Sequence, residues 1–191
     1  MKHLYLMRHG ETLFNLRHKI QGWCDSPLTE EGIAQARRAG EALAERGVVP
    51  SLAFSSTAER ACDTLEIALE TLGRPLVYER VKGLRERYFG TFEGESEDLN
   101  PAPEYYDKLF PLYGGETRAE VRDRVRAALT EIMERPESGT VLAVSHDGAC
   151  MSFTSHLTDP RELIGGRLPN GGILHFGYED GAFSFIELIR P

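Results

Sequence analysis

Short apolar runs are the clearest pattern along the chain. They occupy residues 4–7 (LYLM), 51–54 (SLAF) and 140–145 (TVLAVS), and each is continuous rather than alternating. Strands covered on both faces show continuous apolar runs, so we predict three buried strands. Two further apolar runs lie within residues 171–189 on either side of residues 179–181. This pattern predicts a hairpin that turns at residues 179–181.

Three segments between these runs have helical periodicity. The first follows Thr29 and begins with two glutamates, which complement the positive end of a helix dipole. The others open with STAE (residues 56–59) and TRAE (117–120), which have the pattern of a capping box. In the STAE box we expect Ser56 to cap the helix and the Glu59 side chain to accept a hydrogen bond from the Ser56 amide. The positions predicted to face inward are Ile33, Ala36, Gly40, Leu43, Gly47, Ala61, Leu65, Ala68, Leu72, Val121, Val125, Ala128 and Ile132.

The alternation of strands and helices predicts an α/β fold. We expect three layers, α/β/α, around a mostly parallel central sheet. Residues 87–116 depart from this alternation because they are rich in glycine, proline, acidic and aromatic residues. Long irregular connections are usually functional or disordered, so we expect this segment to cover the open end of the sheet. A short helix is predicted near residues 104–110, and a plain surface connection is the alternative.

Composition and charge narrow the classes of function. A chain of 191 residues with 41% hydrophobic content suits a single domain spanning residues 1–191. The net charge of −8 makes nucleic acid a poor partner, although a locally basic pocket could bind a small anion. Three cysteines without a CxxC pair indicate a reducing cytoplasm rather than a disulfide framework. No apolar run suits a signal peptide or membrane span, so we expect no membrane partner. The oligomeric state is left open.

Polar side chains follow the predicted strands where each strand ends. Arg8 and His9 follow the first, Arg60 lies in the first turn after the second, and His146 follows the third, just before Asp147. Ligands bind outside the carboxyl ends of strands in α/β sheets. Singly, each residue could be an ordinary solvated or packed side chain, but three strand ends together favour a site. Several cationic and N–H donors suit an anion with many oxygens, of which phosphate is the natural candidate.

The sequence resembles the histidine phosphatase superfamily, the phosphoglycerate mutase-like group. The resemblance rests on five motifs that occur in the family's order and span nearly the whole chain. They are MRHGET (residues 7–12), the stretch 15–43, FSSTAERACDTLEIA (54–68), LRERYFGTFEG (84–94) and VLAVSHDGA (141–149). A lone RHG would be a weak signal, whereas five ordered motifs are a specific one.

The resemblance implies a role for each matching residue. His9 corresponds to the phosphorylated nucleophile, and Glu86 corresponds to the proton donor. Arg8, Arg60 and His146 correspond to the phosphate clamp. Further implied phosphate or substrate contacts are Asn15, Gln21, Gly22 and Asp147, of which Asp147 is not the commonest residue at its position. The implied reaction requires no cofactor and no metal.

The implied chemistry sets physical requirements on two residues. A nucleophilic imidazole needs one unprotonated nitrogen, and flanking arginines should lower the pKa of His9. Its other nitrogen needs an acceptor to fix the tautomer, and we expect a backbone carbonyl near Gly10 to provide it. Glu86 must begin protonated if it is to give a proton to the leaving oxygen.

Three functions are compatible with these motifs. The first is a phosphomonoesterase that acts on a small phosphorylated substrate through a phosphohistidine. The second is a phosphoglycerate mutase, but family mutases carry a longer segment between the Glu86 and His146 positions. In addition, residues 91–116 contain Lys108 as their only cation, so they have no basic stretch to hold a second anionic group. Both observations favour the phosphatase over the mutase. The third is a non-catalytic phospho-ligand or protein-binding module on the same fold, against which the pairing of His9 with Glu86 argues.

Overall fold

The central sheet of this computed structural model has six strands in the order β3-β2-β4-β1-β5-β6. The structure describes residues 1–191, except the side chains of residues 161 and 164. Strands β1 to β4 pair in parallel, whereas β5 and β6 are antiparallel, so the prediction of a mostly parallel sheet is confirmed. The strands are β1 (Lys2–Arg8), β2 (Leu52–Ser55), β3 (Tyr78–Arg80), β4 (Thr140–Ser145), β5 (Ile173–Glu179) and β6 (Ala182–Ile189).

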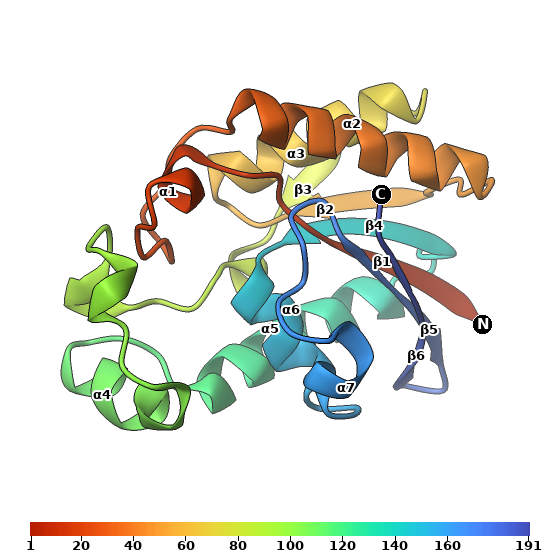
Figure 1. Cartoon of the computed structure of the whole chain (residues 1–191). Helices are drawn as coiled ribbons and strands as arrows, with labels where there is room; N and C mark the ends of the chain where they lie inside the picture. The colour runs from red at the N-terminus through yellow and green to blue at the C-terminus, as the bar shows by residue number, and fades with distance from the viewer.

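Helices cover both faces of the sheet, as Figure 1 shows. Helices α2 and α3 lie on one face, and α5 and α6 lie on the other. The helices are α1 (Leu13–Leu16), α2 (Glu30–Glu45), α3 (Glu59–Thr71), α4 (Tyr106–Leu112), α5 (Arg118–Glu134), α6 (Asp147–Thr154) and α7 (Pro160–Ile164). Short 3-10 turns occupy Lys82–Leu84, Gly90–Phe92, Glu97–Leu99 and Pro103–Tyr105. The predicted α/β/α layering is therefore confirmed.

Alternate residues of the central strand β1 enter two separate hydrophobic cores. Leu4 and Leu6 pack with residues of α5 and α6, whereas Tyr5 and Met7 pack with residues of α2 and α3. All four side chains are buried. A strand covered on both faces has no solvent side for polar residues, and this explains the continuous apolar run.

The predicted helix starts at Thr29 and Thr117 are correct. Thr29 caps α2 by accepting a hydrogen bond from the amide of Gly32. Thr117 and Glu120 form the reciprocal capping box expected from the TRAE sequence. Local side-chain to backbone bonds of this kind need only neighbouring residues, so the sequence is sufficient to predict them.

The predicted capping box at STAE is wrong. Helix α3 begins at Glu59, and its N-cap residue is Ala58, which makes no side-chain cap bond. The hydroxyl of Ser56 instead lies 2.8 Å from Nε2 of His146. The amide of Glu59 donates to Oδ2 of Asp25 at 2.6 Å, so a carboxylate from another segment satisfies this helix end. Tertiary partners therefore replace the local cap.

Two further differences concern short or terminal features. Strand β3 was not predicted, because three partly exposed residues carry no apolar run. Gly47 was expected to face inward but lies beyond the end of α2, exposed and with a φ of 66°. The left-handed conformation there suits glycine and ends the helix. The C-terminal hairpin is confirmed, with its turn at residues 180–181 between β5 and β6.

Residues 87–116 form an excursion beyond the end of the sheet, drawn in green in Figure 1. The expected short helix is present as α4, preceded by the 3-10 turn Pro103–Tyr105. Phe110 is fully buried and makes edge-on contacts with the rings of Phe89, Phe92 and Tyr106. This small aromatic cluster gives the excursion a packed centre of its own.

Candidate active site

The two histidines meet because their strands are adjacent and in register. Arg8, at the end of β1, is paired with Ser145, at the end of β4, so His9 and His146 follow at the same sheet edge. Their ring centres are 5.1 Å apart. Arg60, in the first turn of α3, reaches both rings, with Nε 3.3 Å from Nε2 of His9 and Nη2 3.0 Å from Nδ1 of His146.

The guanidinium of Arg60 is held by acceptors on every side. Besides the two histidines, it donates to the carbonyl oxygens of Cys24 at 2.9 Å and Gly22 at 2.8 Å. Nη1 also donates to Oδ1 of Asp25 at 2.9 Å, which forms an ion pair. Arg60 is only 1% exposed. Its orientation is therefore fixed before any ligand binds.

His9 is held as a neutral imidazole in one tautomer. Nδ1 lies 2.7 Å from the carbonyl oxygen of Gly10, so Nδ1 carries the proton and Nε2 keeps its lone pair. Burial lowers the pKa of His9 well below 6.5, and the charges of Arg60 and Arg8 lower it further. The carbonyl acceptor is the one expected from the sequence, although burial outweighs the arginines as the cause of the shift.

His146 is also neutral but uses its nitrogens in the opposite order. Nδ1 faces the Arg60 guanidinium and accepts, so Nε2 carries the proton and donates to Oγ of Ser56 at 2.8 Å. Burial lowers the pKa of His146 well below 6.5, followed by the charge of Arg60. The ring is fully buried, and it braces Arg60 from behind.

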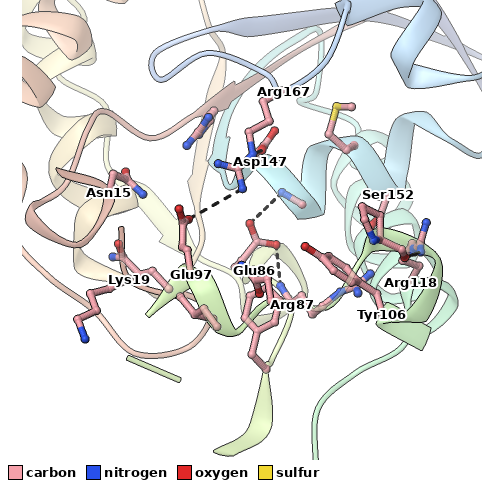
Figure 2. A pocket seen from close by; sticks show the side chains of 18 of the residues that line it. Asn15, Lys19, Glu86, Arg87, Glu97, Tyr106, Arg118, Asp147, Ser152 and Arg167 are labelled. Atoms are coloured by element: carbon pink, nitrogen blue, oxygen red, sulfur yellow. Dashed lines mark hydrogen bonds and ion pairs between the residues drawn. The ribbon is translucent and has the colours of Figure 1, made fainter. Parts of the chain in front are cut away.

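Glu86 is a buried carboxyl group whose pKa is raised above its ordinary value. Burial raises its pKa above 4.5, partly opposed by hydrogen bonds from the backbone. Oε1 accepts from the amide of Arg87 at 2.7 Å, and Oε2 accepts from the amide of Gly148 at 2.9 Å (Figure 2). A Cβ at Gly148 would lie 2.5 Å from Oε1 of Glu86, so glycine is required for this close approach.

A cavity of about 380 Å³ opens beside these groups. Among the predicted site residues, those that line it are Arg8, His9, Asn15, Gln21, Glu86 and Asp147. Gly22, Arg60 and His146 are not part of its lining. Some of the predicted site residues therefore form the cavity wall, and the others lie behind His9.

Arg8 and Asp147 are linked through the chain segment that follows α7. The Arg8 guanidinium donates from Nη1 to the carbonyl oxygen of Leu168, while its buried Nε has no partner. Oδ1 of Asp147 accepts from the amide of Leu168 at 3.0 Å. Asp147 therefore anchors the segment that orients Arg8, and Nε of Arg8 is left to meet a ligand.

Asn15, Gln21 and Gly22 shape the opposite wall of the cavity. Oδ1 of Asn15 accepts from the amide of Thr12 at 3.2 Å. The Gln21 side-chain amide lies 2.6 Å from Oγ1 of Thr12. At Gly22, a Cβ would lie 2.2 Å from the carbonyl oxygen of Arg87, so the backbone is close-packed there.

Glu93 is a supporting residue that the sequence analysis missed. Its carboxylate accepts from the amides of Gly22 at 3.1 Å, Trp23 at 2.9 Å, Cys24 at 2.9 Å and Phe89 at 3.0 Å. It thereby holds the loop that presents carbonyl oxygens to Arg60 against the segment after Glu86. Glu93 belongs to the motif at residues 84–94, so an acidic residue beside a glycine was an available signal.

Further residues at the mouth were also missed. The Arg167 guanidinium lies 3.7 Å from the carboxylate of Asp147 and 3.9 Å from that of Glu97 (Figure 2). It thus connects the first residue of α6 with the excursion at the mouth of the cavity. Arg87, Tyr106 and Arg118 line the outer part of the cavity. Asp25 and Ser56 lie behind it, as partners of Arg60 and His146. Nothing in the spacing of these residues indicates that they converge.

No metal centre is apparent among the side chains that the structure describes. Within that set, no three or more His, Cys, Asp or Glu residues are grouped so that they could hold a metal ion. In the same part of the chain, no helix combines the length and apolar character that a membrane crossing needs. Arg60 and Arg8 supply positive charge near His9.

The fold is that of the phosphoglycerate mutase-like α/β proteins. The sequence profile of the histidine phosphatase superfamily (branch 1) matches residues 4–189. The chain belongs to this superfamily, and the resemblance found in its motifs is confirmed. Its solved relatives include both phosphatases and mutases.

Some of the individual relatives are named as mutases and others as phosphatases. A 2,3-bisphosphoglycerate-dependent phosphoglycerate mutase from Bifidobacterium longum (strain DJO10A) is 39% identical over 111 residues, which cover 58% of this chain and 45% of that protein. The matched region thus spans less than half of that relative's length. The crystal structure of a phosphoglycerate mutase from Bacillus anthracis is 28% identical, with a TM-score of 0.86 over 97% of this chain and 92% of that one. A mycobacterial glucosyl-3-phosphoglycerate phosphatase is 27% identical, with a TM-score of 0.82 over 98% of each chain.

Proposed function

We propose that the protein is a phosphomonoester hydrolase that acts through a phosphohistidine on a small phosphorylated substrate. The observation that carries this proposal is the state of His9. Nδ1 is bonded to the carbonyl oxygen of Gly10, the ring is neutral, and Nε2 lies beside the Arg60 guanidinium at the cavity wall. Glu86, whose pKa is raised by burial, lines the same cavity. A neutral nucleophile and a protonated acid are the two groups that this chemistry needs.

In the first step, Nε2 of His9 forms a bond to phosphorus while the ester P–O bond breaks. The electron pair of that bond goes to the leaving oxygen, which takes a proton from Glu86. Arg8 stabilises the charge on the phosphoryl oxygens, and its unpartnered Nε is available for this contact. Asn15 and Gln21, which also line the cavity, are placed to contact the phosphoryl group or the substrate.

In the second step, water attacks the phosphorus and gives its proton to the Glu86 carboxylate. The P–N bond breaks, its electron pair returns to Nε2, and inorganic phosphate leaves. Arg60 and His146 hold the His9 ring during both steps, and Gly22 supplies a carbonyl oxygen to Arg60. In the phosphoenzyme, Arg60 is close enough to Nε2 to meet the phosphoryl oxygens as well.

We further propose that the reaction needs no metal and no cofactor, because the arginines already supply the positive charge that a metal would provide. The chain from residue 1 to 191 would act as a single domain. A cytoplasmic location fits its three free cysteines, of which two are buried.

A phosphoglycerate mutase is the second candidate, favoured by the names of the B. longum and B. anthracis relatives. It shares the first step, but the phosphoryl group then moves to a bound acceptor. Hydrolysis is favoured by the short segment between Glu86 and His146. A likeness of similar extent to a phosphatase, over 98% of both chains, is compatible with this choice.

The test is turnover of p-nitrophenyl phosphate with parallel measurement of released phosphate and of acid-labile label on His9. A hydrolase releases phosphate in multiple turnovers and carries the label transiently. Interconversion of phosphoglycerates without phosphate release would replace the hydrolase proposal by the mutase. A protein that binds phosphate esters but forms neither label nor product would be a binding module, and both enzymatic proposals would fall.

A further inference from the structure

The cavity wall contains a second buried cation besides Arg8. Arg87 lines the cavity and is only 5% exposed. Its Nη1 is buried and has no hydrogen-bond partner. A buried guanidinium N–H without an acceptor is costly, so this position is complete only when an acceptor is bound.

A second guanidinium faces the same aromatic ring. The Cζ atoms of Arg87 and Arg118 lie 5.6 Å and 5.8 Å from the centre of the Tyr106 ring. All three residues line the cavity, and Figure 2 shows Tyr106 and Arg118 across from Asn15 and Lys19. The side chains come from three segments: the strand-end loop after Glu86, α4 and the start of α5.

The positive charge of this group is only partly balanced. Asp107 pairs with Arg118 at 3.2 Å, and the Arg118 guanidinium also donates to the carbonyl oxygen of Pro103. Glu86 is adjacent, and burial raises its pKa. Burial lowers the pKa of Arg87 and the charge of Arg118 lowers it further, whereas the charges of Glu86 and Asp107 raise it. An oxyanion between the two guanidinium groups would relieve the repulsion between them.

We propose that Arg87, Tyr106 and Arg118 form a subsite for a second anionic group of the substrate. The substrate would then carry a phosphate ester at one end and a carboxylate or second phosphate at the other. This inference rests on the proposed function, and it names the substrate class. It also revises the expectation from the sequence, because the cations lie just outside the window from residue 91 to 116.

The two ends of the cavity show matching unfilled donors. Nε of Arg8, beside His9, and Nη1 of Arg87 are both buried, unpartnered and part of one lining. A neutral substituent could fill the outer end by apolar contact with Phe89 or Met151, but it would leave the Arg87 donor unmet. The polar requirement therefore favours an anion at that position.

The subsite can be tested by binding, without turnover. The probes are phosphonoacetate, 3-phosphonopropionate and 4-phosphonobutyrate, each compared with its own neutral carboxamide by calorimetric titration. Bisphosphonates of the same chain lengths form a second arm. We expect the best carboxylate to bind about 10- to 100-fold more tightly than its carboxamide, the size of one hydrogen bond to a charged group.

Substitutions of single residues test which side chains produce the preference for the carboxylate probes. In Arg87→Met and Arg118→Met, the ratio of carboxylate to carboxamide affinity should fall towards 1. In Lys108→Met, which removes an exposed cation from the same excursion outside the lining, the ratio should stay at the wild-type value. Circular dichroism checks folding, and Arg118, whose side chain is 48% exposed, provides a variant that removes no buried group.

The outcomes separate this inference from the proposed function. A preference for bisphosphonates alone would identify the second anion as phosphate and support the subsite. Equal affinities at every length in the wild type, or a preference that survives both arginine variants, would overturn it. If p-nitrophenyl phosphate is hydrolysed while no anion preference exists, only the subsite is wrong. If the preference exists without hydrolysis, only the proposed function is wrong.

Discussion

Two buried arginines differ in whether their donors are satisfied: Arg60, in the network behind His9 that forms the inner end of the site, and Arg87, in the cavity wall at its outer end. Arg60 has five N–H donors, and five acceptors meet them in the absence of any ligand. Arg87 leaves Nη1 without an acceptor, and its guanidinium faces the Tyr106 ring and another cation. The Arg60 network is therefore assembled by folding alone, whereas Nη1 of Arg87, like Nε of Arg8 beside His9, is left for a ligand.

This difference separates two tasks. A satisfied network holds His9 in one orientation whatever the substrate carries, and such preorganisation favours catalysis. An unsatisfied donor gains most from a ligand that matches it, and this favours specificity. Substitutions at the two ends should consequently differ in what they change: stability and chemical rate at the inner end, and choice of substrate at the outer end.

The largest effect is expected for His9→Ala. Removal of a covalent nucleophile lowers kcat by about 10⁶-fold in well-studied cases, and a loss of that order is expected here. Acid-labile labelling by a ³²P-substrate should disappear at the same time. His18→Ala, which removes an exposed imidazole, is the control and should keep both label and rate. Full turnover in His9→Ala would show that the inner end is not the reaction centre.

Glu86 lies between the two ends, and Glu86→Gln should separate proton donation from phosphate binding. General acid help is worth roughly 10²–10⁴-fold when the leaving group needs a proton. An alkyl alkoxide needs one, whereas p-nitrophenolate is a stable anion. The burst of phosphoenzyme formation should therefore fall far more for an alkyl phosphate than for p-nitrophenyl phosphate. Equal burst defects would leave Glu86 a role only in the shape of the pocket.

Much of the fold could be predicted because its signals are local or periodic. Residues 4–7 and 141–144 are apolar throughout since both strand faces are covered, and Thr117 caps its helix with a partner three residues away. The prediction failed at STAE because Ser56 bonds to His146, which is 90 residues away. Strand β3 was missed because three partly exposed residues cannot carry a period.

The candidate site shows the same limit. Motifs predicted that His9, Arg60 and His146 would come together, and the structure brings them together at one sheet edge. The carbonyl oxygens that hold Arg60 belong to Cys24 and Gly22, and a backbone acceptor has no signature in the sequence. The outer cluster depends on the path of residues 87–116, which has no regular pattern. The sequence therefore shows that Arg87 and Arg118 are present, but it does not show that their side chains lie close together.

Unfolding experiments compare the two arginines directly. Arg60→Met removes the cation of a buried charged network. It leaves the Asp25 carboxylate without its ion-pair partner and the carbonyl oxygens of Cys24 and Gly22 without this donor, so the free energy of unfolding should fall by about 3–5 kcal/mol. Arg87→Met removes a buried cation whose Nη1 had no partner, and its effect should be within about 1 kcal/mol of zero or stabilising. Urea titrations measure both. Similar losses in the two variants would contradict the distinction between a satisfied and an unsatisfied end.

The smallest effect concerns the pH dependence of stability. Burial lowers the pKa values of His9 and His146 in the folded protein, whereas in the unfolded chain both imidazoles titrate near 6.5. Below pH 6.5 the unfolded state therefore binds more protons than the folded state, and the free energy of unfolding should decrease as the pH falls towards the lowered folded values. Above pH 6.5 this contribution to stability is fully present. Each such histidine contributes a slope of at most about 1.4 kcal/mol per pH unit.

His9→Asn should remove one histidine's share of this slope between pH 6.5 and 5, whatever its effect on stability at pH 7.5. Arg87→Met is the matched control from the outer end, because a guanidinium does not titrate in this range and its removal should leave the wild-type slope. Urea titrations at four pH values from 7.5 to 5 measure the difference. If the His9→Asn and wild-type slopes coincide, His9 is not held neutral by burial. The inner end would then lack the unprotonated nitrogen on which the comparison between the two ends depends.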